Sequence, residues 1–160
     1  MMSVELSPSA QRVQQALQSI GYSYEVVELP VSARTAIEAA EAIGCHVGQI
    51  VKSLVFKAKR SGTPILVIAS GENRVKEERI EHLIDEPLGK ADAEFVRQQT
   101  GFAIGGVPPV GHIGQIRTFI DQDLLQYDVI WAAAGTPNAV FRLHANSLVP
   151  MTGGQVVRIT

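Results

Sequence analysis

The sequence predicts a single α/β domain of the α+β kind, with a mixed or largely antiparallel sheet and packed helices. Three observations lead to this prediction. The 160 residues are 46% apolar and 19% charged, which is typical of one globular domain with a sizeable core. Helical and strand patterns are interspersed and several strands are joined by short turns, unlike a regularly alternating Rossmann fold. No repeat or linker divides residues 1–160, so we expect one domain.

Four helices are expected from apolar residues at helical spacing and from residues typical of helix ends. Proline favours the first helical position, serine and aspartate favour the N-cap, and glycine favours the C-terminal stop. The predicted helices run from Ser7 as N-cap to Gly21, from Ala36 to Gly44, from about Val75 to Ile84, and from Ala93 to Thr100 with Asp92 as N-cap.

Strands are expected where apolar and β-branched residues lie between turn-forming residues. Arg60-Ser61-Gly62-Thr63 has the composition of a hairpin turn between two of them. The predicted strands are Tyr22 to Leu29, Val51 to Lys59, Pro64 to Ser70, Phe102 to Ile104, Ile116 to Ile120, Val129 to Ala134, Ala139 to Leu143 and Val156 to Ile159.

The composition argues against several classes of protein. No apolar run approaches the ~20 residues of a membrane-spanning helix, and residues 1–6 lack the pattern of a secretory signal. Cys45 is the only cysteine, so an internal disulfide and a thiolate zinc site are excluded. These features together favour the cytoplasm and no membrane partner. A net charge of −2 argues against a DNA-coating protein but allows a small contact with a nucleic-acid end.

Lys52 is the most informative single residue, because strand alternation places it on an apolar row. Leu54, Phe56 and Ala58 share its parity, whereas Lys57 lies on the more polar row. A charge on an apolar row is costly unless it is paired or used. Lys52 could therefore be a fixed cation at the mouth of a pocket, or a strand-end lysine whose amine reaches solvent. The spacing leaves both interpretations open.

The loop Gly105-Gly106-Val107-Pro108-Pro109 is the second candidate for chemistry. Paired glycines let the backbone approach a ligand closely, and the prolines that follow stiffen the chain. Fixed amide groups of this kind can stabilise a developing oxyanion. A tight turn between two strands accounts for the same residues, so this alternative also stays open.

The other polar residues form no catalytic or metal-binding set in the sequence. The histidines His46, His82, His112 and His144 lack metal-ligand spacing, so we expect neither a metal nor a cofactor. Nucleotide-binding glycine patterns and a serine nucleophile elbow are missing. Cys45 is expected to be a small buried residue. His112, which follows the glycine loop, could line a pocket, polarise a water or have a structural role.

Four segments, in this order, resemble the YbaK-like family, free-standing relatives of the editing insertion of bacterial prolyl-tRNA synthetase. They are Ala42 to Cys45, Gln49 to Phe56, Gly105 to His112 and Ala133 to Thr136. Each segment alone is a weak signal, but the combination is specific, and the resemblance runs over nearly the whole chain. It implies a mixed, strongly curved sheet with helices packed around it.

The resemblance implies an aminoacyl-tRNA deacylase that acts in trans, cleaving the ester between a small wrong amino acid and the 3′ end of a tRNA. The family's lysine corresponds to Lys52, and its Gly-x-x-x-Pro loop to Gly105–Pro109. An aminoacyl ester is already activated, so no protein nucleophile or metal is strictly needed. In this hypothesis Lys52 positions the acceptor end, the amides of Gly105 and Gly106 hold the oxyanion, and a water attacks with help from a ribose hydroxyl.

The remaining residues expected to bind substrate are Ile50, Val107, Pro108, Pro109, His112, Ala133, Gly135 and Thr136. Two departures from the family pattern affect them. Pro108 stands where many relatives have serine, and Ala133 and Val140 stand where some have serine and aspartate. These departures argue against the members that act on cysteinyl-tRNA and favour a branch with another amino-acid selectivity. His112 and Thr136 are the residues left to supply polarity.

Two other interpretations compete with a deacylase. The chain could be a binding module that recognises a tRNA acceptor end or a small ligand without hydrolysis, which the missing polar pocket groups would explain. It could also be an interaction protein in which Lys52 is only a strand-end lysine. The partner expected for the deacylase is the acceptor end of a mischarged tRNA, and an aminoacyl-tRNA synthetase could hold the protein in place.

Overall fold

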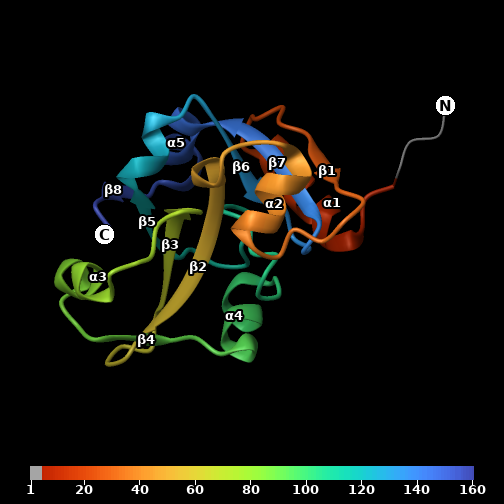
Figure 1. The fold of residues 1–160 in the computed structure, drawn as a ribbon. Helices are drawn as coiled ribbons and strands as arrows, with labels where there is room; N and C mark the ends of the chain where they lie inside the picture. Colours follow the sequence, from red (N-terminus) through yellow and green to blue (C-terminus); the bar gives the residue numbers. More distant parts are fainter. Residues whose placement is uncertain (1–4) are drawn as a thin grey trace.

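A computed structural model describes residues 5–160 of the chain as a mixed sheet with helices on both faces (Figure 1). The helices are α1 (Pro8–Ser19), α2 (Ala36–Ile43), α3 (Glu77–Ile84), α4 (Ala93–Thr100) and α5 (Leu148–Thr152), with short 3₁₀ turns η1 (Val47–Gln49), η2 (Gln122–Gln126) and η3 (Ala145–Ser147). The strands are β1 (Val26–Glu28), β2 (Ile50–Ala58), β3 (Pro64–Ser70), β4 (Leu88–Lys90), β5 (Arg117–Asp121), β6 (Val129–Ala133), β7 (Ala139–His144) and β8 (Gln155–Val157).

The sheet has the strand order β1-β7-β6-β2-β3-β5-β8, and β4 pairs with β2 outside this path. β2 runs antiparallel to β3 and to β4, and β7 runs antiparallel to β1 and to β6. The pairs β2–β6, β3–β5 and β5–β8 are parallel. The long strand β2 curves visibly along its length in Figure 1. This mixed sheet with packed helices confirms the predicted fold class.

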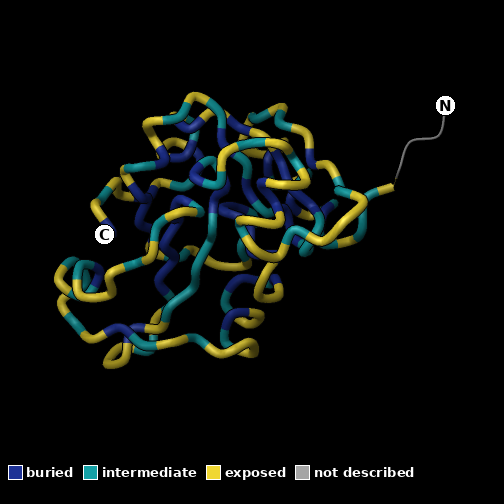
Figure 2. Tube along the Cα trace, in the orientation of Figure 1, coloured by how far each residue is buried: buried dark blue, intermediate teal, exposed yellow. Residues whose placement is uncertain are grey.

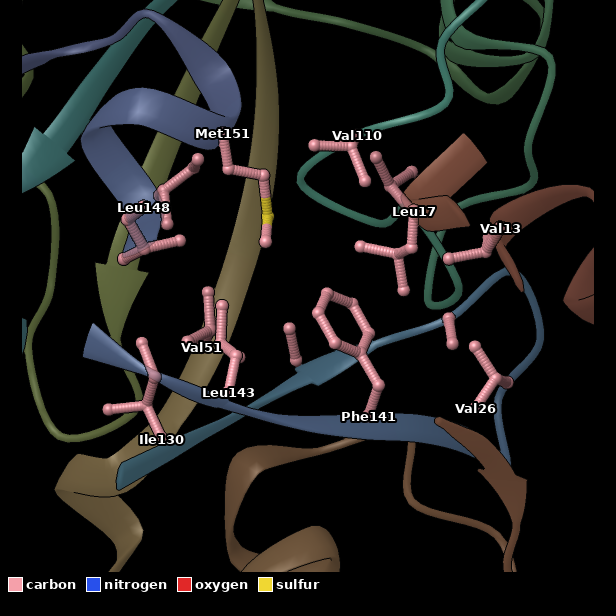
Figure 3. Packing of buried hydrophobic residues seen from close by; sticks show 14 of the residues in the cluster. Val13, Leu17, Val26, Val51, Val110, Ile130, Phe141, Leu143, Leu148 and Met151 are labelled. Carbon is pink, nitrogen blue, oxygen red and sulfur yellow. The ribbon is translucent and has the colours of Figure 1, made fainter. Parts of the chain in front are cut away.

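Each face of the sheet is covered by helices that bury an apolar stripe. On one face, Leu17 of α1 and Leu148 of α5 pack in the same cluster as Val51 and Phe141 of the sheet (Figure 3). On the other face, Ile80 of α3 belongs to a second cluster, and the alanines of α2 pack with Ile50. Alternate residues of β2 therefore face different layers, and Lys52 lies on the side of α2 and α3.

Of the predicted helix-end residues, Asp92 and Gly44 act as expected, whereas Ser7 occupies the N-cap position of α1 without a side-chain capping bond. Thr35 caps α2 by accepting a hydrogen bond from the amide of Glu38 at 3.1 Å, and Asp92 caps α4 by accepting from Phe95 at 2.8 Å. Gly44 ends α2 in the left-handed conformation. Bounds of α1, α2, β2, β3 and α4 agree with the predictions to within one or two residues. Within residues 5–160, no helix has the length and apolar character to cross a bilayer.

The predicted strand from Phe102 to Ile104 is wrong, because this segment turns. Gly101 is in the left-handed conformation, and the amide of Phe102 donates to the hydroxyl of Thr100 at 3.0 Å instead of joining a strand. The ring of Phe102 is buried, with the guanidinium of Arg12 4.4 Å from its centre. The apolar residue that favoured a strand is a core anchor at the start of a loop.

The predicted strand from Tyr22 to Leu29 is too long. Only Val26–Glu28 pair with β7, whereas the rings of Tyr22 and Tyr24 stack on each other at 5.6 Å. The Tyr24 hydroxyl bonds to that of Ser147 at 2.7 Å, so these aromatic residues pack locally. The sequence also gave no prediction for β4 or α5, which have three and five residues.

One edge of β2 is open along its middle. β2 pairs with β6 only at Ile50 and Val51, and with β4 only from Phe56 to Ala58. Among the residues that the structure describes, residues 52–55 therefore have no strand partner on this edge. Figure 2 shows the result, since this stretch is only partly buried while most of β3 beside it is buried. The sheet is split here, next to Lys52.

Candidate active site

A cleft of about 650 Å³ lies along the open edge of β2. Residues of β2 from Ile50 to Phe56 line it, together with residues 33–37 and Ala39, which lie before α2 and in its first half. Val96 of α4 and the loop residues Ile104, Gly105 and Val107 also line it. The turn between β6 and β7 closes the remaining side. Gly71 and the residues Lys90 and Ala91 complete the lining, so the cleft is built from several separate parts of the chain.

Lys52 lies in this cleft with its amine held in place. Its Nζ donates a hydrogen bond to the backbone carbonyl of Asn73 at 2.7 Å. The side chain is half-buried, and this burial lowers the pKa of Lys52 below the ordinary value of a lysine. The like charge of Arg74 lowers that pKa further, while the negative charge of Asp121 opposes the change. The open alternative of a lysine that only reaches solvent fits this arrangement poorly.

The carbonyl that holds Lys52 is fixed by a buried carboxylate. The side-chain amide of Asn73 donates to Asp121 at 2.9 Å and to Asp123 at 2.8 Å. Asp121 is buried and also accepts from the amides of Ser70 and of Asp123, both at 2.9 Å. Asn73 is thereby tied to the end of β5, so its carbonyl has a defined direction toward Lys52.

The charged residues that line the cleft are all positive. They are Arg34 before α2, Lys52 on β2 and Lys90 at the end of β4. No aspartate or glutamate lines it, although the chain as a whole has a net charge of −2. A concave surface with cations of one sign concentrates the field on an anionic ligand. Among residues 5–160, no group of three or more possible ligands is placed to hold a metal ion.

The loop at Gly105 and Gly106 is held by backbone contacts. Gly105 lines the cleft with φ near +92°, a conformation that favours glycine, and its amide donates to no acceptor among the described residues. The amide of Gly106 donates to Ala103 at 3.1 Å, and its carbonyl accepts from Gly135 at 2.8 Å. A Cβ on Gly106 would lie 2.8 Å from the backbone of Gly135. Gly106 thus approaches another part of the protein closely, and its amide is already used.

The wall formed by α2 and the β6–β7 turn is made of small apolar side chains. Ala36 of α2 faces a cleft that Ala133, Trp131 and Val140 also line. Thr136 lines the cleft as well, but its hydroxyl is bonded to Asn138 and to the amide of Ala139, both at 3.1 Å. The hydroxyl of Thr136 therefore stabilises the β6–β7 turn, and this wall offers few unbonded polar groups to a ligand.

Ser53 is the polar residue of the cleft that sequence reasoning missed. Its hydroxyl oxygen is buried and has no hydrogen-bond partner among the described residues. It lies on the open stretch of β2, beside Lys52. A buried hydroxyl without a partner costs about 1–3 kcal/mol.

A second cavity of about 850 Å³ contains Pro109 and His112. The Nε2 atom of His112 lies 2.7 Å from the carbonyl of Pro108, which is buried. Of the expected site residues, Ile50, Lys52, Gly105, Val107, Ala133 and Thr136 line the cleft. Gly106 and Gly135 contact each other beside it. The structure does not bring Pro108, Pro109 or His112 to the cleft lining.

Other cleft residues had no role in the sequence interpretation. Arg34, before α2, and Lys90, at the end of β4, are exposed cations, and nothing in their spacing relates them to Lys52. Asp121 did have a signal, because an aspartate directly after the apolar run of β5 is unusual unless it is bonded. Asn73 lies in the turn after β3, and only the fold brings it to Asp121.

The fold and this cleft match one class of protein, the domains that edit aminoacyl-tRNA. The sequence model of the aminoacyl-tRNA editing domain matches residues 31–150. The chain therefore belongs to the aminoacyl-tRNA editing domain family. The matched range includes α2, the whole of β2 and the glycine loop, which are the parts that build the cleft.

Individual relatives agree with this assignment. The chain is similar to the solved structure of a candidate trans-editing enzyme for prolyl-tRNA synthetase, with 51% identity, a TM-score of 0.93 and coverage of 98% of this chain and 99% of that one. It is 25% identical over 121 residues to EbsC of Enterococcus faecalis, a candidate Cys-tRNA(Pro)/Cys-tRNA(Cys) deacylase, covering 76% of this chain and 74% of EbsC. It is 34% identical over 96 residues to the proline–tRNA ligase of Limosilactobacillus fermentum, covering 58% of this chain and 17% of the ligase.

Proposed function

We propose that this protein is a hydrolase that deacylates mischarged aminoacyl-tRNA in trans, cleaving the ester of a small non-cognate amino acid. The observation that carries the proposal is the fixed cation Lys52 on the open edge of β2, across a cleft whose glycine loop has unbonded amides. A cation and free N–H groups are what an anionic substrate with an ester carbonyl requires. Membership of the editing family supports the same reaction.

The outer part of the cleft suits the 3′ end of a tRNA. Arg34 and Lys90 can meet the phosphates, and the field of an acid-free cleft favours a polyanion over other ligands. Two isoleucines at the rim, Ile37 and Ile104, are 65% and 58% exposed. Exposed apolar side chains on α2 and on the loop offer surfaces for the flat faces of the terminal adenine. The ester then lies between the rim and Lys52.

The chemistry needs only groups that the substrate and this chain supply. A water oxygen adds to the ester carbonyl carbon, and a ribose hydroxyl next to the ester helps to remove the proton of that water. The carbonyl oxygen becomes an oxyanion, for which the free amides of Gly105 and Val107 are the donors. The tetrahedral intermediate then expels the ribose oxygen, which takes up a proton. Lys52 holds the acceptor end through a phosphate or the carbonyl oxygen.

The amino-acid side of the cleft favours a small apolar side chain. Ala36, Ala133 and Val140 present only methyl groups, and the hydroxyl of Thr136 is used within its turn. A methylene-sized difference is worth about 1–3 kcal/mol in such a pocket, so the wall can select by size.

The relatives suggest which tRNA is involved. A candidate trans-editing enzyme for prolyl-tRNA synthetase and a candidate Cys-tRNA(Pro) deacylase are among the proteins that this chain resembles. We therefore extend the proposal to tRNA(Pro) charged with the wrong amino acid. Prolyl-tRNA synthetase is then the enzyme whose errors are removed, and the cytoplasm is the place of action.

A deacylation screen tests the proposal. The purified protein is incubated with tRNA(Pro) carrying alanine, serine, threonine, cysteine or proline, and with the same amino acids on their own tRNAs. We expect release of a small amino acid from tRNA(Pro), retention of proline, and loss of activity in Lys52→Ala. Wild-type rates in Lys52→Ala on every substrate would show that the assignment of Lys52 is wrong.

A second candidate function is binding of the acceptor end without hydrolysis. It is favoured by the apolar wall at Ala133 and Val140, where relatives named in the family resemblance carry polar groups. The same screen separates the two functions, because a binding module protects the ester. Slower ester loss in the presence of the protein than in buffer, for every substrate, would select the binding module.

A further inference from the structure

The carbonyls of the loop 105–109 are tied to the protein at two points. The carbonyl of Gly106 accepts from the amide of Gly135 at 2.8 Å. The carbonyl of Pro108 lies 2.7 Å from the Nε2 atom of His112. Both partners lie outside the cleft lining, Gly135 in the β6–β7 turn and His112 in the second cavity. The loop is therefore held from behind.

These two bonds determine where the loop amides can point. In a trans peptide the carbonyl and the following N–H point in opposite directions, and the described chain has no cis peptide. Because the Gly106 carbonyl points at Gly135, the N–H of Val107 points away from Gly135. Val107 lines the cleft, and its amide has no acceptor among residues 5–160. The orientation of the loop thus determines whether its N–H groups are available to a ligand in the cleft.

His112 can hold the loop in one tautomer only. A carbonyl oxygen accepts, so the proton must be on Nε2, and Nδ1 is then unprotonated. Burial lowers the pKa of His112, while the bond to Pro108 raises it. Burial is the larger effect, so the pKa of His112 is lowered overall, and a hydrogen bond from Nε2 does not require an added charge on the ring. Pro108 and Pro109 have no N–H, so the peptide between them can be fixed only through its carbonyl.

We propose that His112 is a positioning residue that orients the loop 105–109 through the carbonyl of Pro108. The inference rests on the proposed function, because it assigns the loop amides to the oxyanion of the ester. His112 acts without touching the substrate. Without its bond, the end of the loop at Pro108 is no longer tied, only the contacts of Gly106 with Ala103 and Gly135 remain, and the donors are held less firmly before the substrate arrives. The expected loss is therefore in kcat, while substrate binding by Lys52 and the rim is unchanged.

The test compares two variants that differ in one donor group. His112→Leu keeps much of the volume but has no N–H, whereas His112→Gln keeps a donor near the position of Nε2. We expect kcat for deacylation to fall about tenfold or more in His112→Leu with KM within about twofold, and His112→Gln to regain most of the loss. His82→Leu, at an exposed position of α3, is the control, and we expect it to leave kcat and KM unchanged. Equal losses in the leucine and glutamine variants, or a wild-type kcat in both, would overturn the proposal.

A measurement on the wild type keeps the proposal testable if a variant does not fold. Nitrogen-15 NMR of labelled histidine distinguishes the two tautomers. We expect His112 to carry its proton on Nε2, with slow exchange, at neutral pH. A proton on Nδ1 would contradict the proposal. If the wild type releases no amino acid from any mischarged tRNA, the proposed function is wrong. If the wild type is active and the His112 variants are equally active, only the proposed role of His112 is wrong.

Discussion

Lys52 carries a charge into a cleft that is otherwise built largely from apolar side chains and backbone. Its neighbours on the same side of β2 are Leu54 and Phe56, and only the carbonyl of Asn73 bonds to its amine. Desolvation lowers the pKa of Lys52, which means that the protein holds the charged form at a cost in folding free energy. Such a cost is typical of a residue kept for function.

We predict a pH-dependent difference in stability between wild type and Lys52→Met. The pKa of Lys52 in the folded protein lies below 10.5, the ordinary value that holds in the unfolded chain. At a pH between the folded and the unfolded pKa, the unfolded chain therefore binds more protons than the folded protein. The wild type therefore gains stability as the pH rises through this window, and Lys52→Met has no such gain. Urea unfolding from pH 7 to 10.5 should show the free energy of Lys52→Met falling relative to that of the wild type. A difference that is constant with pH would contradict the desolvated state of Lys52.

Strand parity singled out Lys52 as a charge on an apolar row and left its role open, and it could not identify the residues that support Lys52. The alternation of side chains along a strand depends only on neighbouring residues, so the sequence alone showed that Lys52 places a charge on an apolar row. Asn73 and Asp121 lie 21 and 69 residues away in sequence, and their contact depends on the parallel pairing of β3 with β5. His112 was expected as a pocket residue because it follows the glycine loop. The turn of the chain at Gly111, which has a left-handed backbone, puts it behind the loop instead.

At the scale of elements, the open edge of β2 separates two banks of the cleft. α2 stands on one bank and the loop after α4 on the other, and each presents one exposed isoleucine at the rim, Ile37 and Ile104. β6 pairs with β2 only as far as Val51, so no strand joins the two banks along the following stretch of β2.

We predict that Ile37→Ala and Ile104→Ala each lower kcat/KM for deacylation about fivefold, because each isoleucine buries apolar area against the terminal base. The measurement is a double-mutant cycle with a substrate whose terminal nucleotide lacks its base. On this abasic substrate the two variants should equal the wild type. Ile113→Ala is the matched control, since Ile113 is equally exposed but lies outside the cleft lining. Equal losses on both substrates would exclude contact with the base.

The elements that the sequence predicted well are those with strong end signals. α2 and α4 have side-chain caps and a glycine stop, and β3 follows a hairpin turn. β4 was missed because three residues that include a glycine have no periodicity, and their pairing depends on β2. Phe102 was assigned to a strand because burial alone cannot distinguish a strand from an anchored loop.

At the scale of the whole molecule, the charge of the cleft is opposite in sign to the net charge of the chain. The net charge of −2 would by itself repel a polyanion, yet the cleft contains only cations among its charged residues. The cleft therefore attracts an anionic ligand over a short range. At an ionic strength of 0.15 M charges are screened over about 8 Å, so the outer surface has little influence on a substrate already at the rim.

We predict that binding of the acceptor end weakens with salt, with a slope that the cleft cations determine. Each neutralised phosphate of a single strand contributes about −0.7 to the slope of log K against log salt concentration. Arg34→Ala and Lys90→Ala should each reduce the slope by about that amount. Arg158→Ala, an exposed cation outside the cleft lining, should leave the slope unchanged. Identical slopes in all four proteins would mean that the phosphates bind elsewhere.

The unpaired stretch of β2 also bears on how this protein resists aggregation. Residues 52–55 have no strand partner on this edge, so their backbone groups could pair with a strand of another molecule. Natural sheets usually cover such edges. Here α2 and the glycine loop stand in front of the edge in place of a neighbouring strand. Local unfolding of α2, a helix of eight residues, would expose it. We therefore expect a ligand that occupies the cleft to slow aggregation of the protein on heating.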